Sequence, residues 1–310
     1  MVIQTTTLEN ALNAYGITAW RVLNPSDLDE EKSRLKAWLH EGYHADMEWM
    51  PRHADKRCSP TLLWEGVQSI VVVVLNYFPG WEAGQGDTIK IARYALGKDY
   101  HKIIRRKLAK VLQHLQEEHP DLNGRPFVDS APLLEKALAV RAGLGWQGKH
   151  SLLITKATGS WVMIGTLFLN KPVEWTHPPQ ENTLETGHCG TCTRCITACP
   201  TEAILAPTQV DSRRCIAYWT IENADDALPE AITTHQNGWI FGCDICQDVC
   251  PWNIKFSHLT EEPAFAPRPM LQHPQQECFV SMTEEDFEKH FQNSPLRRTG
   301  LKRIKRNLPS

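Results

Sequence analysis

This chain is organised around the stretch His188-Cys189-Gly190-Thr191-Cys192-Thr193-Arg194-Cys195-Ile196-Thr197-Ala198-Cys199-Pro200. Its cysteines follow the spacing Cys-x2-Cys-x2-Cys-x3-Cys-Pro, which is typical of bacterial ferredoxins that hold [4Fe–4S] clusters. Two-residue gaps let one tight loop deliver three thiolates to a cluster, and the fourth cysteine, before a proline, typically serves a second cluster. Zinc and disulfides are the alternatives, and this spacing with its trailing proline favours iron–sulfur ligation over both.

A second run, Gly242-Cys243-Asp244-Ile245-Cys246-Gln247-Asp248-Val249-Cys250-Pro251, repeats the ending of the first. Ile240 stands where its first cysteine would be, so the two runs supply seven thiolates although two clusters need eight. Cys58, Cys215 and Cys278 are the spare cysteines, and Cys215 is the preferred eighth ligand because it lies between the runs. Exchanging the fourth ligands predicts one cluster on Cys189, Cys192, Cys195 and Cys250 and the other on Cys199, Cys215, Cys243 and Cys246. The other two spare cysteines are expected to be ordinary thiols.

The composition sets limits on the class of protein. A length of 310 residues predicts two domains with ample core. Ten cysteines without a recognisable leader indicate metal ligands in the cytoplasm rather than disulfides. No apolar run reaches the roughly 18 residues that span a membrane, so no membrane partner is expected.

Charge is distributed unevenly along the chain. The net charge is −3, but from Arg297 onward all charged residues are basic, so the rest of the chain is more acidic than the total indicates. A basic tail on an acidic body favours a nucleic-acid partner, and an ordinary solvated basic helix is the equally good alternative. The candidate contacts are Arg297, Arg298 and Lys302, with Arg213 and Arg214 as second candidates.

Hydrophobic periodicity predicts the elements of an N-terminal α/β domain with a mixed sheet over residues 1–180. Helices are expected at 8–20, at 27–41 with Ser26 as the N-cap and Gly42 as the end, and at 100–118. Residues 47–57 are expected to form a loop. Strands are expected at 67–76, which is apolar throughout and therefore covered on both faces, at 127–129, and as a hairpin of 151–155 with 161–169.

The remaining chain is expected to form two further parts. A polar connector at 172–186 leads into a ferredoxin-like module with two clusters over 181–260. Residues 261–310 form a Pro-rich segment followed by a basic helical tail at 283–309, with a break near Pro295.

Asp129 is the strongest candidate for a functional polar residue in the α/β domain. It follows a strand and precedes Ser130-Ala131-Pro132, which is expected to start a helix, and ligand sites in α/β proteins lie at such positions. A helix cap is the simpler alternative. The chain has neither a Gly-x-Gly-x-x-Gly after a strand nor a phosphate-binding Walker loop, so nucleotide cofactors lack support. Asp99-x-His101 begins like a cobalamin-binding Asp-x-His-x-x-Gly motif, but Ile104 stands at the glycine position, so that motif fails.

Four further stretches carry a family resemblance. They are Arg93-Tyr94-Ala95-Leu96-Gly97-Lys98-Asp99-Tyr100-His101, Val128-Asp129-Ser130-Ala131-Pro132-Leu133-Leu134-Glu135-Lys136, Ala142-Gly143-Leu144-Gly145-Trp146-Gln147-Gly148-Lys149-His150-Ser151-Leu152-Leu153 and Arg214-Cys215-Ile216-Ala217-Tyr218-Trp219-Thr220-Ile221-Glu222. Together with the two cysteine runs they make residues 40–306 resemble the epoxyqueuosine reductase family, which is similar to the reductive dehalogenases.

The resemblance implies an activity and its cofactors. The family reduces the epoxide of epoxyqueuosine, at the wobble position of tRNA, to queuosine, the last step of queuosine biosynthesis. It implies a cobalamin-binding domain whose cob(I)alamin is fed by two [4Fe–4S] clusters, and an external electron donor of flavodoxin or ferredoxin type. A cytoplasmic monomer is expected.

The resemblance also implies roles for single residues. It makes Asp129 the proton donor and Cys215 a cluster ligand, in agreement with the count of thiolates. It places the following residues at the cobalamin: Arg57, Tyr94, Lys149, Ser151, Ile154 and Asp244.

Two other classes of protein are kept as alternatives. A reductive dehalogenase would act on a small organic substrate, which leaves the basic tail without a role. A ferredoxin-type electron carrier would need no domain of about 180 residues before its clusters.

Overall fold

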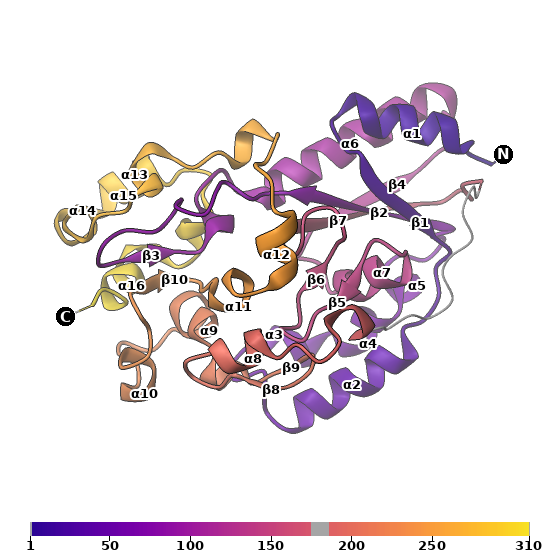
Figure 1. The fold of residues 1–310 in the computed structure, drawn as a ribbon. Helices are drawn as coiled ribbons and strands as arrows, with labels where there is room; N and C mark the ends of the chain where they lie inside the picture. Colours follow the sequence, from indigo (N-terminus) through magenta and orange to yellow (C-terminus); the bar gives the residue numbers. More distant parts are fainter. Residues whose placement is uncertain (1, 175–185, 310) are drawn as a thin grey trace.

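The computed structural model describes residues 2–174 and 186–309. An antiparallel sheet flanked by helices fills one end of the molecule, and the cysteine-rich segments and the C-terminal helices fill the other (Figure 1). Residues 175–185, which make up most of the expected connector, lie outside the described part. No helix in the described ranges combines the length and the apolar character that a membrane crossing requires.

The main sheet has four strands in the order β1-β2-β7-β4, and every neighbouring pair is antiparallel. Its strands are β1 (Ala19–Leu23), β2 (Ser69–Asn76), β7 (Val162–Leu169) and β4 (Gly124–Phe127). The prediction of a mixed sheet is therefore wrong for this sheet. An apolar run reports that a strand is buried, and it carries no information on the direction of the neighbouring strands.

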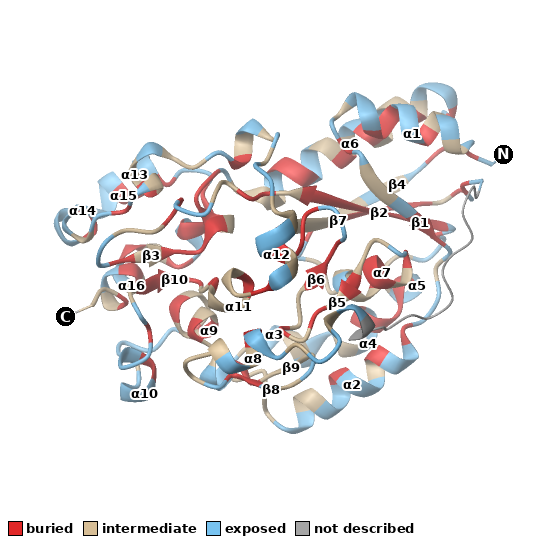
Figure 2. Cartoon of the chain, viewed as in Figure 1, coloured by how far each residue is buried: buried red, intermediate tan, exposed pale blue. Residues whose placement is uncertain are grey.

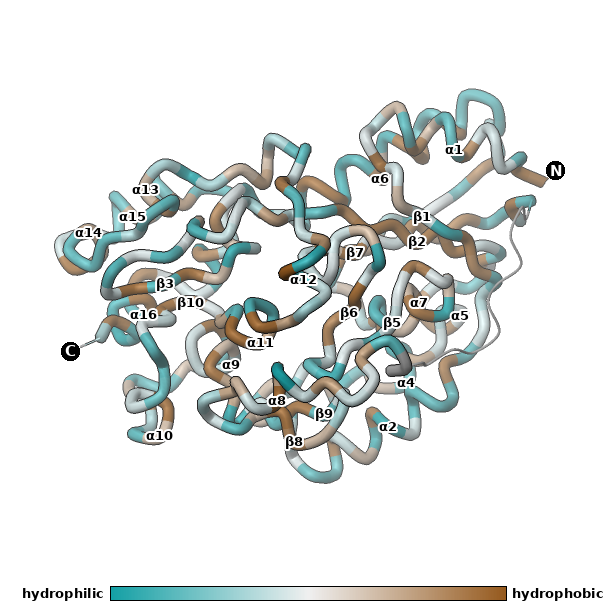
Figure 3. The backbone as a smooth tube through the Cα atoms, in the orientation of Figure 1, coloured by the Kyte–Doolittle hydropathy of each residue, from teal (hydrophilic) through white to brown (hydrophobic). Residues whose placement is uncertain are grey.

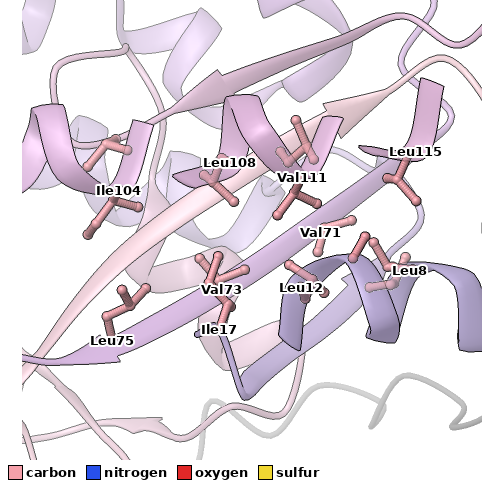
Figure 4. Packing of buried hydrophobic residues seen from close by; sticks show 14 of the residues in the cluster. Leu8, Leu12, Ile17, Val71, Val73, Leu75, Ile104, Leu108, Val111 and Leu115 are labelled. Atoms are coloured by element: carbon pink, nitrogen blue, oxygen red, sulfur yellow. The ribbon is translucent and has the colours of Figure 1, made fainter. Parts of the chain in front are cut away.

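Strand β2 is covered on both faces, as predicted. Alternate side chains point to opposite faces of a strand, so Val71, Val73 and Leu75 join one core and Ile70, Val72 and Val74 join another. Helices α1 (Thr5–Ala14) and α6 (Tyr100–Glu118) supply the first core (Figure 4). Helices α2 (Asp29–His40) and α7 (Glu135–Arg141) supply the second. Figure 3 shows the resulting hydrophobic band along β2.

Several predicted elements differ at their ends. The helix expected at 8–20 stops at Ala14, because Gly16 adopts a φ of +70° and the chain turns into β1. Helix α2 has Leu28 at its N-cap position rather than Ser26, and no side chain caps it. Helix α6 has the bounds that were predicted.

Two local predictions are wrong. The expected loop at 47–57 contains the short helices α3 (Trp49–Arg52) and α4 (Ala54–Cys58), which α5 (Pro60–Leu63) follows. The expected hairpin does not form, because β6 (Leu153–Ile154) pairs with β5 (Trp146–Gln147) while β7 enters the main sheet. Strands are present at both places, but each pairs with a partner elsewhere in the chain.

The cysteine-rich segment folds into short elements joined by turns. They are α8 (Arg194–Ala198), β8 (Ile204–Ala206), β9 (Gln209–Val210), α9 (Ile216–Ile221), α10 (Glu230–Thr233), β10 (Trp239–Phe241), α11 (Ile245–Asp248) and α12 (Pro251–Phe256). Strand β10 pairs in parallel with β3 (Lys90–Ile91) from the N-terminal half.

The C-terminal tail is helical with a break at Pro295, as predicted. It contains α13 (Pro269–Gln272), α14 (Gln276–Ser281), α15 (Glu284–His290), the 3-10 helix Pro295–Arg298 and α16 (Gly300–Arg306). These helices form a third core with Ile240, Phe241 and the segment 83–96. Figure 2 shows β10 buried along its length, and Ile91 of β3 is buried as well. The N-terminal half of the chain thus supplies part of the core of the C-terminal helices.

Candidate active site and cluster ligands

Asp129 lies on a turn two residues beyond the end of β4. Its φ of +52° is left-handed, a conformation that Asp and Asn tolerate better than most residues. Its backbone N–H donates to both carboxylate oxygens of Glu135, at 2.9 and 3.0 Å. The following helix, α7, begins only at Glu135 and not at Pro132 as expected. The alternative of a helix cap is therefore wrong, and the Asp129 side chain is available for other contacts.

Those contacts come from the first turn of α6. The Tyr100 hydroxyl donates to Asp129 Oδ2 at 2.6 Å, and His101 Nε2 lies 3.0 Å from the same oxygen. The other ring nitrogen of His101, Nδ1, lies 2.8 Å from Asp99 Oδ1, and Asp99 also caps α6. Because both ring nitrogens face a carboxylate, the imidazolium form satisfies both contacts at once.

The pKa shifts of these side chains indicate which of them carries the proton. Burial alone would lower the pKa of His101, but Asp129 and Asp99 together raise it to about 9. Burial would raise the pKa of the Asp129 carboxyl, but the hydrogen bonds from His101 and Tyr100 lower it overall. At neutral pH the pair therefore holds its proton on His101. Burial and the charge of Asp129 also raise the pKa of Glu135 to about 8.

Asp129 opens into a pocket of about 400 Å³. The pocket is also lined by Tyr94 and by Arg297 and Arg298 of the tail, so the structure brings three of the predicted regions together. Arg298 pairs with Glu222 at 2.7 Å, and its guanidinium lies 5.8 Å from the centre of the Trp49 ring. The tail thus forms one wall of the pocket that contains the candidate proton donor.

Lys136 follows Glu135 at the start of α7 and is exposed. Burial lowers the pKa of Lys136, and the charge of Asp129 opposes that shift. Lys136 Nζ donates to the carbonyl of Ser151 at 2.9 Å, which connects α7 to one residue of the predicted cobalamin segment. Burial lowers the pKa of Arg57, and the charge of Asp129 opposes that shift. Arg57 Nη2 donates to the Trp49 carbonyl at 3.0 Å.

The first four cysteines of the predicted arrangement are neighbours. Burial and the nearby thiols of Cys189, Cys250 and Cys192 together raise the pKa of Cys195 to about 11. Cys250 is affected by the same neighbours from the first run. Cys250 also packs with Trp146, next to Cys189 and Trp252. Cys250 of the second run thus lies among the thiols of the first run, and the division of the eight thiols between two clusters stays a prediction.

The thiols of the second group are partly buried and close to one another. Burial raises the pKa of Cys246 well above its usual value, and Cys215 and Cys199 are among the neighbours that raise it further. The pKa of Cys243 is raised in the same way by burial, Cys246 and Cys215. The spare thiols lie elsewhere: Cys58 is buried in the second core, and Cys278 is exposed on α14. Across the described ranges, no three His, Cys, Asp or Glu side chains converge on a single point as the ligands of one metal ion would.

A second and larger cavity lies beside the first group of thiols. Its volume is about 990 Å³, and its lining includes Arg21, the turn 143–146, the turn 155–158 and His188. The ring of His188 packs on Trp146 at a centroid distance of 4.5 Å. The cavity thus borders Thr155 and His188, which are the chain neighbours of Ile154 and Cys189.

Other predicted residues have partners within the protein. Asp244 is buried and accepts from the backbone N–H of Arg93 at 2.8 Å and from Arg93 Nη1 at 3.1 Å, so its carboxylate serves a buried ion pair. Lys149 Nζ donates to the carbonyl of Gly190 at 2.8 Å. Four predicted nucleic-acid contacts are engaged as well: Arg213 with Asp211, Arg214 with the carbonyl of Glu202, Arg297 with Glu288, and Lys302 with Asp226.

Three residues of the site were missed by sequence reasoning. His101 was considered only as a cobalt ligand in a motif that fails, and Tyr100 and Glu135 were not considered. A signal was available, because Asp99 and His101 stand at a helix start, where an Asp often caps and leaves the adjacent side chains at the helix end.

Comparisons with known proteins identify the family of the chain. Residues 188–253 match the family "4Fe-4S double cluster binding domain", and residues 57–130 match "Epoxyqueuosine reductase QueG, DUF1730". The chain is 43% identical over 282 residues to the epoxyqueuosine reductase of Cyclobacterium marinum, covering 91% of this chain and 88% of that protein. It is 42% identical over 307 residues to the Escherichia coli enzyme, covering 97% and 77%.

A solved structure shares the fold. It is an epoxyqueuosine reductase in complex with an epoxyqueuosine-modified tRNA-Tyr stem loop, with a TM-score of 0.85 and 30% identity over 97% of this chain and 78% of that chain. The dehalogenase and the electron-carrier alternatives are set aside. The chain belongs to the epoxyqueuosine reductase family.

Proposed function

We propose that this chain reduces the epoxide of epoxyqueuosine in tRNA to the alkene of queuosine. The reaction consumes two electrons and two protons, and it releases the epoxide oxygen as water. The observation that carries the proposal is the Asp129–His101 pair, which holds a proton at a pocket walled by Arg297 and Arg298. A relative of the same fold binds a tRNA stem loop that carries this base.

The surroundings of Asp129 fit cobalamin, because they offer donors for a large polar cofactor. Lys136 is exposed and its Nζ donates to the carbonyl of Ser151, and Arg57 Nη2 donates to the carbonyl of Trp49. Arg57, Tyr94, Lys149, Ser151 and Ile154 are the proposed residues that hold the corrin. When bound, cobalamin would supply the low-potential electrons and the nucleophilic cobalt that epoxide reduction needs.

The eight thiols are the proposed cluster ligands, in the two groups described above. Tyr94 connects the second group of thiols to the pocket that contains Asp129. It lines that pocket, and it packs in the same small core as Cys243. Electrons would thus reach the pocket that contains Asp129 from the side of Tyr94.

The chain's own residues manage the proton. When the epoxide ring opens, its oxygen develops negative charge, and a positioned acid typically contributes about 10²–10⁴ in rate. Asp129 is the group at the pocket, and His101 holds the proton at neutral pH and returns it to Asp129 as the oxygen accepts one. Glu135 fixes the backbone of Asp129 in its left-handed turn, and Asp99 orients the His101 ring.

The direct test is reconstitution. The chain is loaded anaerobically with iron, sulfide and cobalamin, reduced chemically and incubated with tRNA that carries epoxyqueuosine, and the nucleosides are then analysed. Formation of queuosine supports the proposal, and its absence from protein with full cofactor content contradicts it. We further propose a monomer that works in the cytoplasm, with the domain division 1–180, 181–260 and 261–310.

His101→Gln is expected to change the pH profile. In the wild type, turnover falls as pH rises through about 9, because the proton on His101 is then lost. The variant has no such proton, so its rate is lower at neutral pH and the limb near pH 9 disappears. The measurement is single-turnover reduction from pH 6 to 10, and a variant that keeps the limb would assign it to another group.

The same substitution gives a stability test. The folded-state pKa of His101 lies above its ordinary value of 6.5, so its ion pairs stabilise the protein fully below pH 6.5 and lose that effect as pH rises through about 9. The difference in Tm between the wild type and His101→Gln should therefore shrink across this window.

Neutralising Arg297, Arg298 and Lys302 is expected to weaken tRNA binding. Each now pairs with a carboxylate, but exposed pairs are worth only about 0–1 kcal/mol, so phosphates can replace the acidic partners. The logarithmic salt slope of binding should flatten by about 0.7 to 0.9 for each lost phosphate contact. Arg34→Gln, which removes a similar exposed pair on α2, is the matched control. An unchanged slope in the triple variant would exclude the tail from tRNA binding.

A further inference from the structure

Three tryptophans bury their indole N–H group where the described part of the chain offers no acceptor. They are Trp146, Trp161 and Trp239, which are 3%, 0% and 1% exposed. A buried donor without a partner destabilises a fold, so native proteins pair nearly all such donors, and an exception indicates a bound group that accepts the hydrogen bond. An acceptor that is not a protein atom is therefore expected at these positions.

Other tryptophans show that this chain does pair buried indoles where it can. Trp38, Trp219 and Trp252 each donate from Nε1 to a backbone carbonyl, at 2.7, 2.7 and 3.2 Å. Trp252 is the closest comparison, because it packs against the same small core as Trp146. Two indoles of one core thus differ, since one has a protein acceptor and the other has none among the described residues.

Trp146 lies against the first group of thiols. It shares a small core with Cys250, and Cys189 packs against that core. The centre of the Trp146 ring lies 4.5 Å from the ring centre of His188, the residue before Cys189. A Cβ atom on Gly145 would lie 2.1 Å from a backbone carbonyl oxygen of β6, so glycine is needed for β5 to approach β6 this closely. The Trp146 indole is therefore held beside two thiols of the first group.

Trp239 lies against the second group of thiols in a similar way. It shares a small core with Ile216, the residue after Cys215, and Cys243 packs against that core. Its strand, β10, ends two residues before Cys243 (Figure 1). A glycine again precedes the tryptophan: Gly238 has a φ of +80°, and a Cβ atom there would lie 2.6 Å from a backbone carbonyl oxygen. Each group of thiols thus has one buried indole beside it.

An iron–sulfur cluster would supply the acceptor that both indoles lack. Its sulfides and thiolate sulfurs carry negative charge, and hydrogen bonds to these sulfurs are among the factors that set the reduction potential. Reduction adds one electron, which makes the sulfurs stronger acceptors, because a hydrogen bond strengthens with the charge on its acceptor. A donor beside them therefore stabilises the reduced cluster more than the oxidised one, and so raises the potential.

We propose that Trp146 donates its indole N–H to a sulfur of the first cluster, and that Trp239 donates to a sulfur of the second. The proposal rests on the proposed function, because it takes the two groups of thiols as cluster ligands. No proton is transferred, since the hydrogen stays on the indole nitrogen while the cluster gains and loses one electron. Both residues act on the potential at which electrons are passed on, and neither touches the substrate.

The experiment uses the reconstituted holoenzyme with Trp146→Phe or Trp239→Phe, each of which keeps an aromatic ring and removes the N–H. The midpoint potentials of both clusters are measured by a redox titration that is followed by EPR. Trp161→Phe is the matched control, because Trp161 is equally buried and unpaired but lies in the first core, whose described members include no cysteine. Trp252→Phe is the second control, because it changes the packing beside Cys189 but removes a donor that a carbonyl accepts.

Each of the two variants is expected to lower the potential of one cluster, and each of a different one. The reduction equilibrium of that cluster should shift by about threefold to tenfold, which is about 30 to 60 mV for a one-electron couple. Both control variants should keep the wild-type potentials. Unchanged potentials in Trp146→Phe and Trp239→Phe would overturn the proposal, as would an equal shift of both clusters by one variant or an equal shift in the controls.

A second measurement does not depend on how well the variants fold. Wild-type protein is prepared with tryptophan that carries an isotopic label on the indole nitrogen, and the reduced clusters are studied by pulsed EPR. Magnetic coupling to the labelled nitrogen supports the proposal, and its absence from both clusters contradicts it. Failure of the proposed function looks different, because the clusters would then show the coupling in a protein that forms no queuosine.

Discussion

Asp129→Asn is expected to lower the single-turnover rate of epoxide reduction by about 100-fold or more. Asparagine tolerates the left-handed backbone at this position, and its side-chain oxygen can still accept from Tyr100 and His101. The fold, the cluster content and the cofactor content should therefore match the wild type. What the variant lacks is a carboxylate that can take the proton from His101 and pass it to the substrate.

The measurement uses protein that is reduced before mixing with tRNA, so that electron delivery does not limit the rate. Asp121→Asn is the matched control, because Asp121 is an exposed acid paired with Lys171 on another part of the surface. Wild-type rates in Asp129→Asn across the pH range would remove Asp129 from the mechanism. They would leave His101 or a water as the proton donor.

Cys215→Ser is expected to lose one of the two clusters, and with it about half of the iron and sulfide and nearly all turnover. Serine is a poor substitute for a thiolate ligand of iron, and Cys215 lies next to Cys199 among the thiols of the second group. Since Cys243 of that group packs in one small core with Tyr94, which lines the Asp129 pocket, electrons from the other cluster would no longer be passed on. Iron analysis and the absorbance of the reconstituted protein measure the loss.

Cys58→Ser and Cys278→Ser are the controls for this result. Cys58 lies in the second hydrophobic core and Cys278 on the surface of α14, away from either group of thiols. Both variants should keep full iron, although the buried Cys58→Ser is expected to be less stable. Full iron in Cys215→Ser, or half in Cys58→Ser, would refute the assignment of the eighth ligand.

The elements that were predicted correctly are those with a long local pattern. Strand β2 is apolar without interruption, and α6 repeats its apolar residues at helical spacing over five turns. The errors arose where the deciding contact lies far along the chain. Strand β6 pairs with β5 and not with the neighbouring β7, and β1 pairs with β2 across four intervening helices. Gly16 was the local sign that the first helix ends early.

The candidate site likewise has one part that could be predicted from the sequence and one part that could not. The cysteine arrangement was accessible from the sequence, because the spacing of the ligands is set by the cluster that they hold. The Asp129 network was not, because Tyr100 and His101 reach Asp129 from the start of a different element, and only the packing of α6 on the sheet brings them together. Side chains that meet only through tertiary packing have no characteristic spacing in the sequence, so their contact could not be predicted from it.

The core shared by segment 83–96 and the C-terminal helices constrains how the chain is made. On the ribosome, Ile89, Ile91 and Leu96 emerge long before Phe241, Phe279 and Phe287, which bury them. Contacts between residues so distant in sequence form slowly, and apolar surface that waits for its partner is prone to aggregate. Synthesis must therefore run almost to the last helix before the strand β3 is protected, so a ribosome that stalls within the tail releases a chain whose two halves are both incomplete.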